Sequence, residues 1–368
     1  MSENAQKIPC RVVLQPSEEK YINEKVRNFQ GCPTIAVTGK GRIFVGWYAG
    51  GIQEPHMDNF NLMVYSDDMG ESWSKPIVVI PSSKENFVHA LDIQLWTAPD
   101  GALHIYWVQN NTESAVGSDG KIRHGNYGPT VDGYIFDDII HAEWRMICRN
   151  PDDEELLFSE PECLDKGFLR CKPTMLESGR QLNFNYDQTS DRYGYSVSDD
   201  CGKTFRHLYG GKKINVWFDE TMAYQLHDGS IRMLARTSVG ALAESYSYDN
   251  AETWTDGTET KIPNPDTRFF VSRMPSGKIL LLNNDHKAER CNLAVYISED
   301  DGKTWAYKKV IDPRRDVSYP DADFYGGRIY AVYDRERCGA REILFASFSE
   351  QEIMDDQYEI KVSIISKP

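Results

Sequence analysis

Several features that mark other protein classes are missing from this sequence of 368 residues. It has no run of 18 apolar residues, so we expect no membrane-spanning helix. It also has no Cys-x-x-Cys pair, which argues against a structural zinc site or a disulfide framework and favours reduced thiols. Helical periodicity is nearly absent. The eight cysteines are Cys10, Cys32, Cys148, Cys163, Cys171, Cys201, Cys291 and Cys338.

Positive charge is also scarce. Lysine and arginine number 41 against 56 aspartate and glutamate residues, which leaves a formal net charge of −15. A diffusely acidic surface argues against nucleic acid and anionic membranes as partners, and an anionic substrate would need a locally basic pocket. The first residues, MSENAQKIPC, show no secretory signal pattern, so we expect a cytoplasmic protein.

Repeats are what the sequence contains instead. Four segments share a Ser-x-Asp pattern that ends in an aromatic residue, namely SDDMGESW (66–73), SDDCGKTF (198–205), SYDNAETW (247–254) and SEDDGKTW (298–305). In such a segment, Ser and Asp side chains bond to nearby backbone N–H groups, and glycine takes a positive φ. We interpret these four segments, the Asp boxes, as hairpin turns that do not touch a substrate.

A second repeat occurs six times. Each copy begins with glycine and continues with alternating apolar residues, as in GRIFVGW and GKILLLN, and each follows another short apolar run. The glycines are Gly41, Gly101, Gly179, Gly229, Gly277 and Gly327. Each copy predicts a hairpin within a blade of four antiparallel strands, and six copies predict an all-β, six-bladed β-propeller.

This architecture makes the chain a single domain, 1–368, with blades that start near residues 30, 90, 171, 219, 267 and 318. Blade two carries an insertion at 108–145, rich in Gly, Asn and Asp. We expect either VVLQ near the N-terminus or YEIKVSII near the C-terminus to complete a blade and close the ring. SEQEIMDD is the one stretch with helical character.

Strand direction predicts which face of the disc carries the binding site. The Asp boxes join the third and fourth strands, so they lie opposite the starts of the first strands and the ends of the second strands. Polar residues at those starts and ends are candidates for a central site. Counting back from the glycines gives Cys32, Asp92, Lys172, Glu220, Arg268 and Tyr319. Strand ends and starts add Trp47, Tyr48, Trp107, Arg236 and Arg290.

The segment DETMAYQLHDGSIRMLAR is the most informative. Glu220 begins its first strand and Arg236 ends its second, so the hairpin places carboxylate and guanidinium side by side. Tyr319, two blades further round, is expected across a narrow central cavity. A glutamate near a tyrosine hydroxyl can draw its proton and make the phenol a nucleophile. Alternatively, the charged pair pins the hairpin and Tyr319 caps the channel.

These residues resemble the sialidase (neuraminidase) superfamily over nearly the whole chain. The segment from Glu220 to Arg236 is similar to the one whose Glu assists the nucleophile and whose Arg binds the substrate carboxylate. RCNLAVYISEDDGKTW is similar to the segment with another carboxylate-binding arginine, here Arg290. SYPDA is similar to the segment with the nucleophile, which implies Tyr319. A Tyr nucleophile is the sialidase departure from glycosidases with paired carboxylates.

The chain departs from the family at the start of blade one. Sialidases have Arg-Ile-Pro there, and its arginine completes a triad that binds carboxylate. This chain reads QGCP, with Gln30, Gly31 and Cys32 at that place. Arg268 or Lys172 could substitute for the missing arginine. A changed set of anchors would suit a different acidic or deoxy sugar.

The acid/base aspartate of sialidases follows the second strand of blade one. The loop WYAGGIQEPHMDNF offers Glu54, His56 and Asp58 for this role, and we favour Glu54. His89 could face the pocket as a proton carrier or hydroxyl donor, and Asp92 could bind a sugar hydroxyl. Either residue could equally be structural, His89 in the interior and Asp92 at a turn.

The best-supported hypothesis is an exo-acting glycoside hydrolase that removes a terminal acidic sugar, sialic acid or a related keto or uronic acid. Tyr319 would be the nucleophile, Glu220 its activator, and Glu54 or Asp58 the acid/base. Arg236 and Arg290, with Arg268, would hold the carboxylate of this small carbohydrate substrate.

We expect neither a metal nor a cofactor, because no phosphate-binding glycine loop and no metal-binding motif is present. Two other functions are compatible with the same residues. One is a carbohydrate-binding propeller without hydrolysis. The other is a hydrolase or lyase acting on a neutral, plant-type sugar in the manner of an exo-arabinanase.

Overall fold

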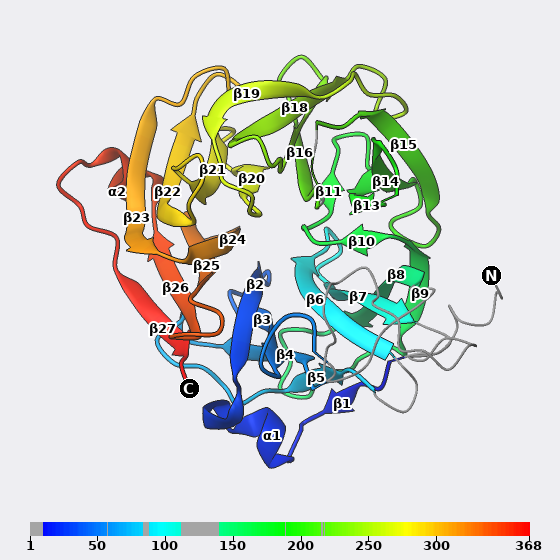
Figure 1. The fold of residues 1–368 in the computed structure, drawn as a ribbon, viewed down its shortest axis with the longest axis vertical. Helices are drawn as coiled ribbons and strands as arrows, with labels where there is room; N and C mark the ends of the chain where they lie inside the picture. The colour runs from blue at the N-terminus through cyan, green and yellow to red at the C-terminus, as the bar shows by residue number, and fades with distance from the viewer. Residues whose placement is uncertain are drawn as a thin grey trace, which may run out of the picture.

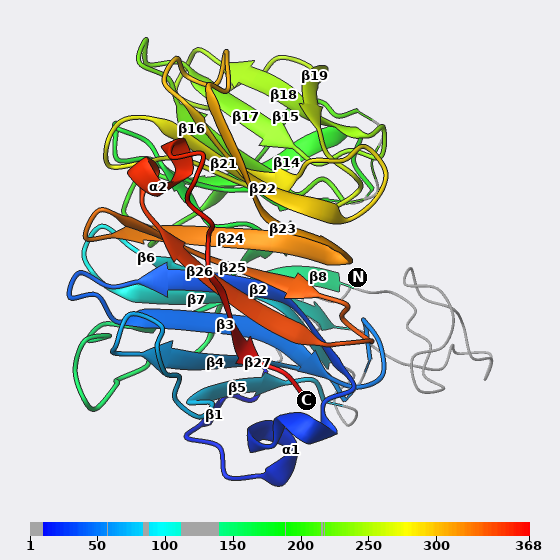
Figure 2. The same cartoon turned by 90° about the vertical axis from the view of Figure 1, so that its left-hand side faces the viewer.

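The fold is that of a computed structural model, which describes residues 10–56, 58–83, 88–111, 140–187, 189–214, 216 and 218–368. Six antiparallel blades stand around a central axis, each with one edge strand nearest the axis (Figure 1). Seen from the side, the strands run through the thickness of the disc (Figure 2). The predicted six-bladed β-propeller is confirmed.

Blades one to three contain the first fifteen strands. Blade one consists of β1 (Val13–Leu14), β2 (Phe29–Val37), β3 (Ile43–Gly50), β4 (Phe60–Ser66) and β5 (Val78–Pro81). Blade two consists of β6 (Val88–Thr97), β7 (Leu103–Asn111), β8 (Ile140–Cys148) and β9 (Glu162–Lys166). Blade three consists of β11 (Thr174–Met175), β12 (Gln181–Asn183), β14 (Arg192–Ser198) and β15 (Arg206–Lys212), beside the pair β10 (Phe168–Leu169) and β13 (Asn185–Tyr186).

Blades four to six are regular. Blade four consists of β16 (Thr221–Gln225), β17 (Ile231–Ala235), β18 (Ala241–Ser247) and β19 (Thr258–Pro263). Blade five consists of β20 (Phe270–Arg273), β21 (Ile279–Asn284), β22 (Cys291–Ser298) and β23 (Tyr307–Arg315). Blade six consists of β24 (Val317–Tyr325), β25 (Arg328–Arg335), β26 (Glu342–Phe348) and β27 (Val362–Ser366).

The helices of the described residues are short: α1 (Glu19–Ile22), the 3₁₀ turn η2 (Glu24–Val26) and α2 (Glu350–Met354). None of them has the length or apolar character needed to cross a membrane. The helical character expected for SEQEIMDD is confirmed by α2, which Ser349 and Glu352 start with a reciprocal capping box. All eight cysteines lie among the described residues and are free thiols.

The ring closes without an exchange of strands between blades. β1 adds to the outer edge of blade one through β5, and β27 is the outer strand of blade six, next to its predecessor in the chain. The contact between these blades includes Asp321 on β24, which accepts hydrogen bonds from Thr34 Oγ1 at 2.7 Å and from Ile35 N at 3.0 Å. The C-terminal segment therefore completes a blade as expected, but side chains join the first blade to the last.

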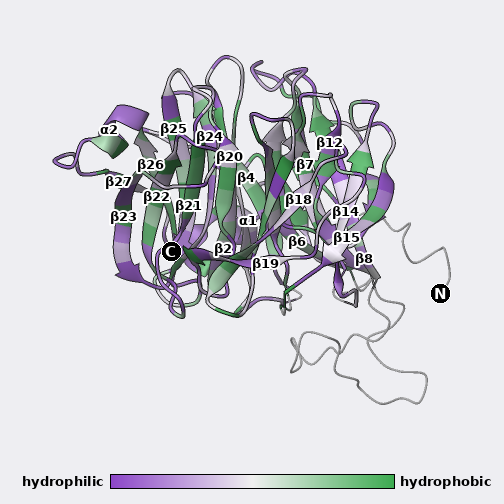
Figure 3. Cartoon of the chain, turned by 90° about the horizontal axis from the view of Figure 1, so that it is seen from above, coloured by the Kyte–Doolittle hydropathy of each residue, from purple (hydrophilic) through white to green (hydrophobic). Residues whose placement is uncertain are grey.

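The apolar core lies between the blades. One buried cluster joins blades one and two through residues such as Phe44 and Ile93, and another joins blades four, five and six through residues such as Leu281 and Leu344. Figure 3 shows hydrophobic segments on inner strands such as β21 and hydrophilic ones on the outer strand β23 and on loops. This distribution agrees with inner strands that are buried nearly throughout, as β2 and β21 are.

The Asp boxes form the turns between third and fourth strands, as predicted. In the second box, Asp200 accepts hydrogen bonds from the backbone N of Thr204 at 2.9 Å and from its hydroxyl at 2.7 Å. Ser198 Oγ accepts a bond from Gly202 N, and Gly202 has a φ of +75°. These bonds satisfy turn amides and keep the boxes at the ends of the strands opposite Tyr319.

The insertion in blade two is shorter than the predicted range 108–145. β7 continues through Asn111 and β8 begins at Ile140, so both ends of that range belong to strands. Alternation of apolar residues in LHIYWVQ and AEWRMIC explains these extensions. The remainder of the predicted insertion lies outside the described residues.

Candidate active site

Three of the innermost strands carry a bulge near their first residues. The register of β2, β6 and β24 shifts at this place, and each bulge holds a residue other than glycine in the left-handed region. These residues are Cys32 with φ +55°, Asp92 with φ +44° and Tyr319 with φ +55°. A bulge re-aims a side chain, and a strained backbone of this kind is common at functional sites. Here the bulges direct side chains toward the axis.

A cavity of about 200 Å³ lies on the axis beside these bulges. Its lining comes from all six blades, which agrees with the predicted face of the disc. The lining residues are Glu54, Pro55, Leu91, Asp92, Phe168, Arg170, Phe218, Arg236, Arg290, Tyr319 and Arg337. Four of these residues are arginines, so the cavity is locally basic within an acidic protein.

Arg236 links Tyr319 and Glu220 by hydrogen bonds. The Nη1 atom of Arg236 donates hydrogen bonds to the Tyr319 hydroxyl at 2.9 Å and to Glu220 Oε2 at 2.7 Å. The hairpin of β16 and β17 sets this arrangement, because Arg236 N also bonds to Glu220 O at 2.9 Å. The predicted neighbours are therefore together, with the guanidinium between carboxylate and phenol.

Electrostatics keep Glu220 charged. Burial alone would raise the pKa of this carboxyl, but Arg236, Arg170 and Arg268 outweigh burial and lower the pKa to about 2. Burial raises the pKa of Tyr319, and Arg236 opposes that rise. At neutral pH the site therefore holds an anionic carboxylate, an arginine and a protonated phenol in a row.

Arg170 is the centre of a second group of charges. Its guanidinium lies 2.9 Å from Asp92 Oδ1, 3.4 Å from Glu54 Oε1 and 3.3 Å from Glu220 Oε1. Burial raises the pKa of Asp92, and Arg170 opposes this effect. One buried arginine thus links carboxylates from blades one, two and four.

Arg337 covers the Tyr319 ring. The guanidinium carbon lies 4.1 Å from the ring centroid, and Nη1 donates to Glu54 Oε2 at 2.9 Å. Nε donates to Asp334 Oδ2, also at 2.9 Å. Glu54 therefore lies between two arginines at the edge of the cavity, with 22% of its side chain exposed.

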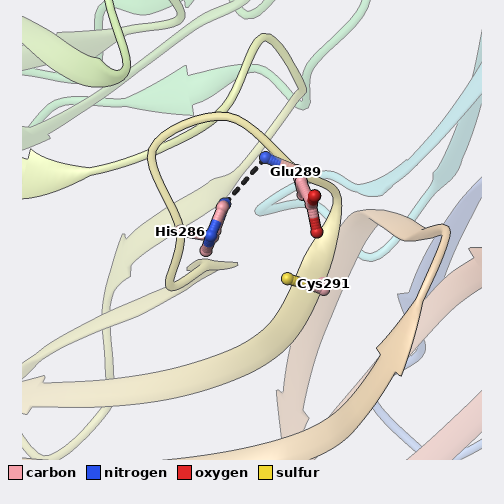
Figure 4. Close-up of side chains that lie close together, drawn as sticks. All are labelled: His286, Glu289 and Cys291. Atoms are coloured by element: carbon pink, nitrogen blue, oxygen red, sulfur yellow. Dashed lines mark hydrogen bonds between the residues drawn. The ribbon is translucent and has the colours of Figure 1, made fainter.

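Arg290 lies at the end of the loop between β21 and β22. Its guanidinium carbon is 5.4 Å from the Tyr319 ring centroid, and Nη2 donates to Asp266 O at 2.9 Å. His286 shapes this loop, because its Nδ1 accepts hydrogen bonds from the backbone N of Ala288 at 3.2 Å and of Glu289 at 2.8 Å (Figure 4). The His286 imidazole thus stabilises the turn that places Arg290 at the cavity.

Two clusters bring together groups that could in principle bind a metal. His286, Glu289 and Cys291 place ligand atoms within 4.8 Å of one another (Figure 4). However, an Nδ1 that accepts two N–H bonds has its lone pair occupied and leaves the proton on Nε2, so neither nitrogen is free to ligate. The second cluster, Cys32 with Glu54 and Asp92, already has its carboxylates paired with arginine.

Two predicted substrate-binding residues lie elsewhere. Lys172 does not line the central cavity, because its Nζ donates to Ala322 O at 2.6 Å and it borders a larger cavity of about 460 Å³ at the far ends of the inner strands. Arg268 is buried below the site, where it donates to Tyr319 O at 3.2 Å and to Arg170 O at 3.0 Å. Arg268 therefore supports the backbone of two cavity residues.

Two other candidates also lie outside the cavity. Asp58 is exposed and lies 3.7 Å from His56 Nδ1, and both residues border a separate cavity beside α1. His89 is buried in β6, and burial lowers its pKa to about 3, so it is neutral. Among the three acid/base candidates, Glu54 alone lines the central cavity.

Two charged cavity residues, Arg337 and Arg170, were missed in the sequence. Arg337 follows the second strand of blade six, the position that Arg236 occupies in blade four, so the same rule applied to blade six would have found it. Arg170 was missed because counting back from Gly179 pointed to Lys172. The inner strand of blade three is interrupted between Leu169 and Thr174, so the polar residue nearest the axis comes earlier in the chain.

Comparisons with known proteins agree with this fold. A family model described as a BNR repeat-like domain matches residues 151–327. The anhydrosialidase of Macrobdella decora is 26% identical over 211 residues, which are 48% of this chain and 27% of that protein. The sialidase of Micromonospora viridifaciens is 30% identical over 128 residues, which are 32% of this chain and 19% of that protein. The match thus spans less than a third of either relative.

A solved structure resembles the whole propeller. The intramolecular trans-sialidase from Ruminococcus gnavus, in complex with oseltamivir carboxylate, has a TM-score of 0.70 and 16% identity, and the match covers 92% of this chain and 98% of that one. At this level of identity, the match shows a shared fold. The resemblance to the sialidase superfamily, predicted from the sequence, is confirmed.

Proposed function

We propose that this protein is an exo-acting glycoside hydrolase of the sialidase type, which removes a terminal acidic sugar from a small glycoside. The observation that carries the proposal is the hydrogen bond of 2.9 Å from Arg236 to the Tyr319 hydroxyl, inside a cavity lined by four arginines. A volume of about 200 Å³ suits a single sugar ring, as an exo-acting enzyme requires.

Similarity to named proteins supports the same class of reaction. The two curated relatives are a sialidase and an anhydrosialidase. The Ruminococcus gnavus protein was solved with a compound that bears a carboxylate. An arginine-lined cavity in a chain of net charge −15 is the locally basic pocket that such a substrate needs.

In the first step, the Tyr319 oxygen would attack the anomeric carbon while the bond to the leaving oxygen breaks. Glu54, after taking up a proton from solvent, would give that proton to the leaving oxygen. Glu220 would draw the phenol proton, and its Oε1, which lies 3.3 Å from Arg170 Nε, accepts no hydrogen bond from the described residues. Arg236, already bonded to the phenol, would stabilise negative charge on the oxygen as the proton leaves.

In the second step, Glu54 would remove a proton from water, and the water oxygen would displace Tyr319 from the anomeric carbon. The departing Tyr319 oxygen would take back its proton from Glu220. The products are the free sugar with retained configuration and the restored phenol. A neutral phenol suits a sugar whose anomeric carbon bears a carboxylate, because an approaching carboxylate nucleophile would be repelled.

The experiment is to measure turnover of aryl glycosides of sialic, uronic and neutral sugars by the protein and by Tyr319→Phe. We expect turnover of acidic glycosides only, and a loss on the order of 10³-fold or more in kcat/KM for the variant. Tyr325→Phe, on the same strand but at its far end, is the matched control and should keep full activity. Undiminished turnover by Tyr319→Phe, or a preference for neutral glycosides, would contradict the proposal.

A further inference from the structure

We infer that Arg337, from blade six, binds the substrate carboxylate together with Arg236 and Arg290. It thereby supplies the guanidinium that blade one lacks at Gly31. This role rests on the proposed function, because it assumes an acidic sugar in the central cavity. Four observations carry it: the space at Gly31, the position of Arg337, a donor without a partner, and the different surroundings of Arg170.

The first observation is the space above Gly31. A Cβ atom built on this glycine would lie 2.8 Å from Arg337 Cδ and 2.9 Å from its Cγ. The backbone at Gly31 has no left-handed φ, so its conformation does not require glycine. What requires glycine is the Arg337 side chain, which occupies the room that a side chain at 31 would take.

The second observation is how firmly Arg337 is held. Asp334 fixes Nε and Glu54 fixes Nη1, each at 2.9 Å, while the Tyr319 ring lies against the guanidinium face. Tyr319, Arg236, Arg290 and Arg337 all line the one cavity. A pre-organised guanidinium loses little conformational freedom when it binds a planar carboxylate.

The third observation is the remaining nitrogen. Nη2 of Arg337 is buried and has no hydrogen-bond partner among the described residues. Buried donors of this kind are nearly always satisfied by protein, water or ligand. A carboxylate oxygen in the cavity would satisfy it and would place the anion between Arg337 and the other two arginines.

The fourth observation separates Arg337 from Arg170. Arg170 faces three carboxylates within 3.4 Å, so its charge is already balanced and it serves to position them. Arg290, in contrast, makes no ion pair with any described residue, and its guanidinium is partly exposed at the cavity. Arg290 therefore has an unbalanced charge for an incoming anion, whereas Arg337 pairs with Glu54 and Asp334 and offers only its Nη2.

The test compares binding of a free acid with binding of its methyl ester, using N-acetylneuraminic acid and glucuronic acid and their esters in ligand-observed NMR titrations. Of the two acids, the one that binds more tightly to the wild-type chain should bind more tightly than its methyl ester. Arg337→Met should reduce that preference by roughly tenfold or more, and Arg337→Lys should restore part of it, because an ammonium carries the charge without the planar fork. Arg341→Met, in the same loop, is the matched control.

A relocated arginine makes the test independent of folding defects. In the double variant Gly31→Arg/Arg337→Gly, removal of the Arg337 side chain opens the space that an arginine at 31 needs. The double variant should regain preference for the free acid, whereas Arg337→Gly alone should lack it. Thermal melting shows which variants are folded.

Two outcomes would overturn the inference, and they are distinguishable. If the wild-type chain prefers the acid and Arg337→Met or Arg337→Lys keeps the full preference, Arg337 does not bind the carboxylate, although the proposed function stands. If the wild-type chain binds the acids no better than their esters, the proposed function is wrong, and the role of Arg337, which depends on it, is wrong too.

Discussion

At the scale of single residues, the main feature of the cavity is the group of guanidiniums around the Tyr319 ring. Tyr319 has the guanidinium carbons of Arg337, Arg268, Arg290 and Arg170 at 4.1, 4.9, 5.4 and 5.8 Å from its ring centroid. Such surroundings would stabilise negative charge on the phenol oxygen in the proposed reaction, although burial keeps the resting phenol protonated by raising its pKa.

Glu54 is the residue whose role is easiest to separate from the rest. If it protonates the leaving oxygen, Glu54→Gln should lower kcat/KM by about 10²-fold or more for glycosides with poor leaving groups. The loss should be much smaller for aryl glycosides with good leaving groups, because these need no proton. Steady-state kinetics over a series of aryl glycosides measures the difference.

The matched control for Glu54 is Asp58→Asn. Asp58 belongs to the same loop but borders a different cavity, so its substitution should leave the leaving-group dependence unchanged. An equal loss for all leaving groups in Glu54→Gln would mean that Glu54 only positions Arg337 and Arg170.

At the scale of elements, strand bulges and Asp boxes lie on opposite faces of the disc and have different roles. Bulges at the starts of β6 and β24 direct Asp92 and Tyr319 into the cavity, and the bulge in β2 places Cys32 beside Glu54. The Asp boxes, in contrast, close the opposite ends of the third strands. The boxes therefore contribute to stability and leave the chemistry untouched.

Asp249→Ala tests this division. Asp249 accepts a hydrogen bond from Thr253 N at 2.9 Å and also bonds to the Ser247 hydroxyl, so its removal leaves turn groups without a partner. We expect the Tm to fall by roughly 1–3 °C for a domain of this size. The kcat/KM value should not change, and a large loss of activity at unchanged Tm would contradict a purely structural role for the boxes.

At the scale of the whole molecule, stability depends on contacts between neighbouring blades. Glu143 on β8 of blade two is fully buried. It accepts hydrogen bonds from two residues of blade three, Asn183 and Asn185, and the bond from Asn185 is 3.0 Å long. Burial raises the pKa of this carboxyl to about 8, although the bond from Asn183 opposes the rise. The folded protein therefore holds a proton here at neutral pH.

This proton makes folding stability depend on pH. Between the ordinary glutamate pKa of 4.5 and the folded value of about 8, the folded state binds more protons than the unfolded state. The free energy of unfolding should therefore fall as pH rises through this window, by up to ~1.4 kcal/mol per pH unit from this residue.

Glu143→Gln removes the titrating group. Denaturant unfolding at pH 5, 6, 7 and 8 should show a flatter dependence of the unfolding free energy on pH than in the wild-type chain. Glu162→Gln is the control, because Glu162 lies on the neighbouring strand, has 48% of its side chain exposed and pairs with Arg145. Equal slopes for Glu143→Gln and the wild-type chain would show that Glu143 is ionised in the folded state.

Much of this molecule is determined locally in its sequence. Alternating apolar runs after Gly41 and its five counterparts specify hairpins, and the Asp boxes specify the turns between outer strands, because both depend on residues a few positions apart. The hairpin from Glu220 to Arg236 is local in the same sense, so its charged pair could be predicted. The blade count and the face of the disc that carries the cavity follow from these short-range patterns.

Only the tertiary structure decided which polar residues share the cavity. Arg337 and Gly31 are more than 300 positions apart in the chain, and only closure of the ring lays one side chain over the other. Lys172 and Arg170 differ by two positions, yet an interrupted strand sends one to the far end of the axis and the other to its centre. Contacts between blades join residues distant in sequence, and no pattern within a single repeat encodes them.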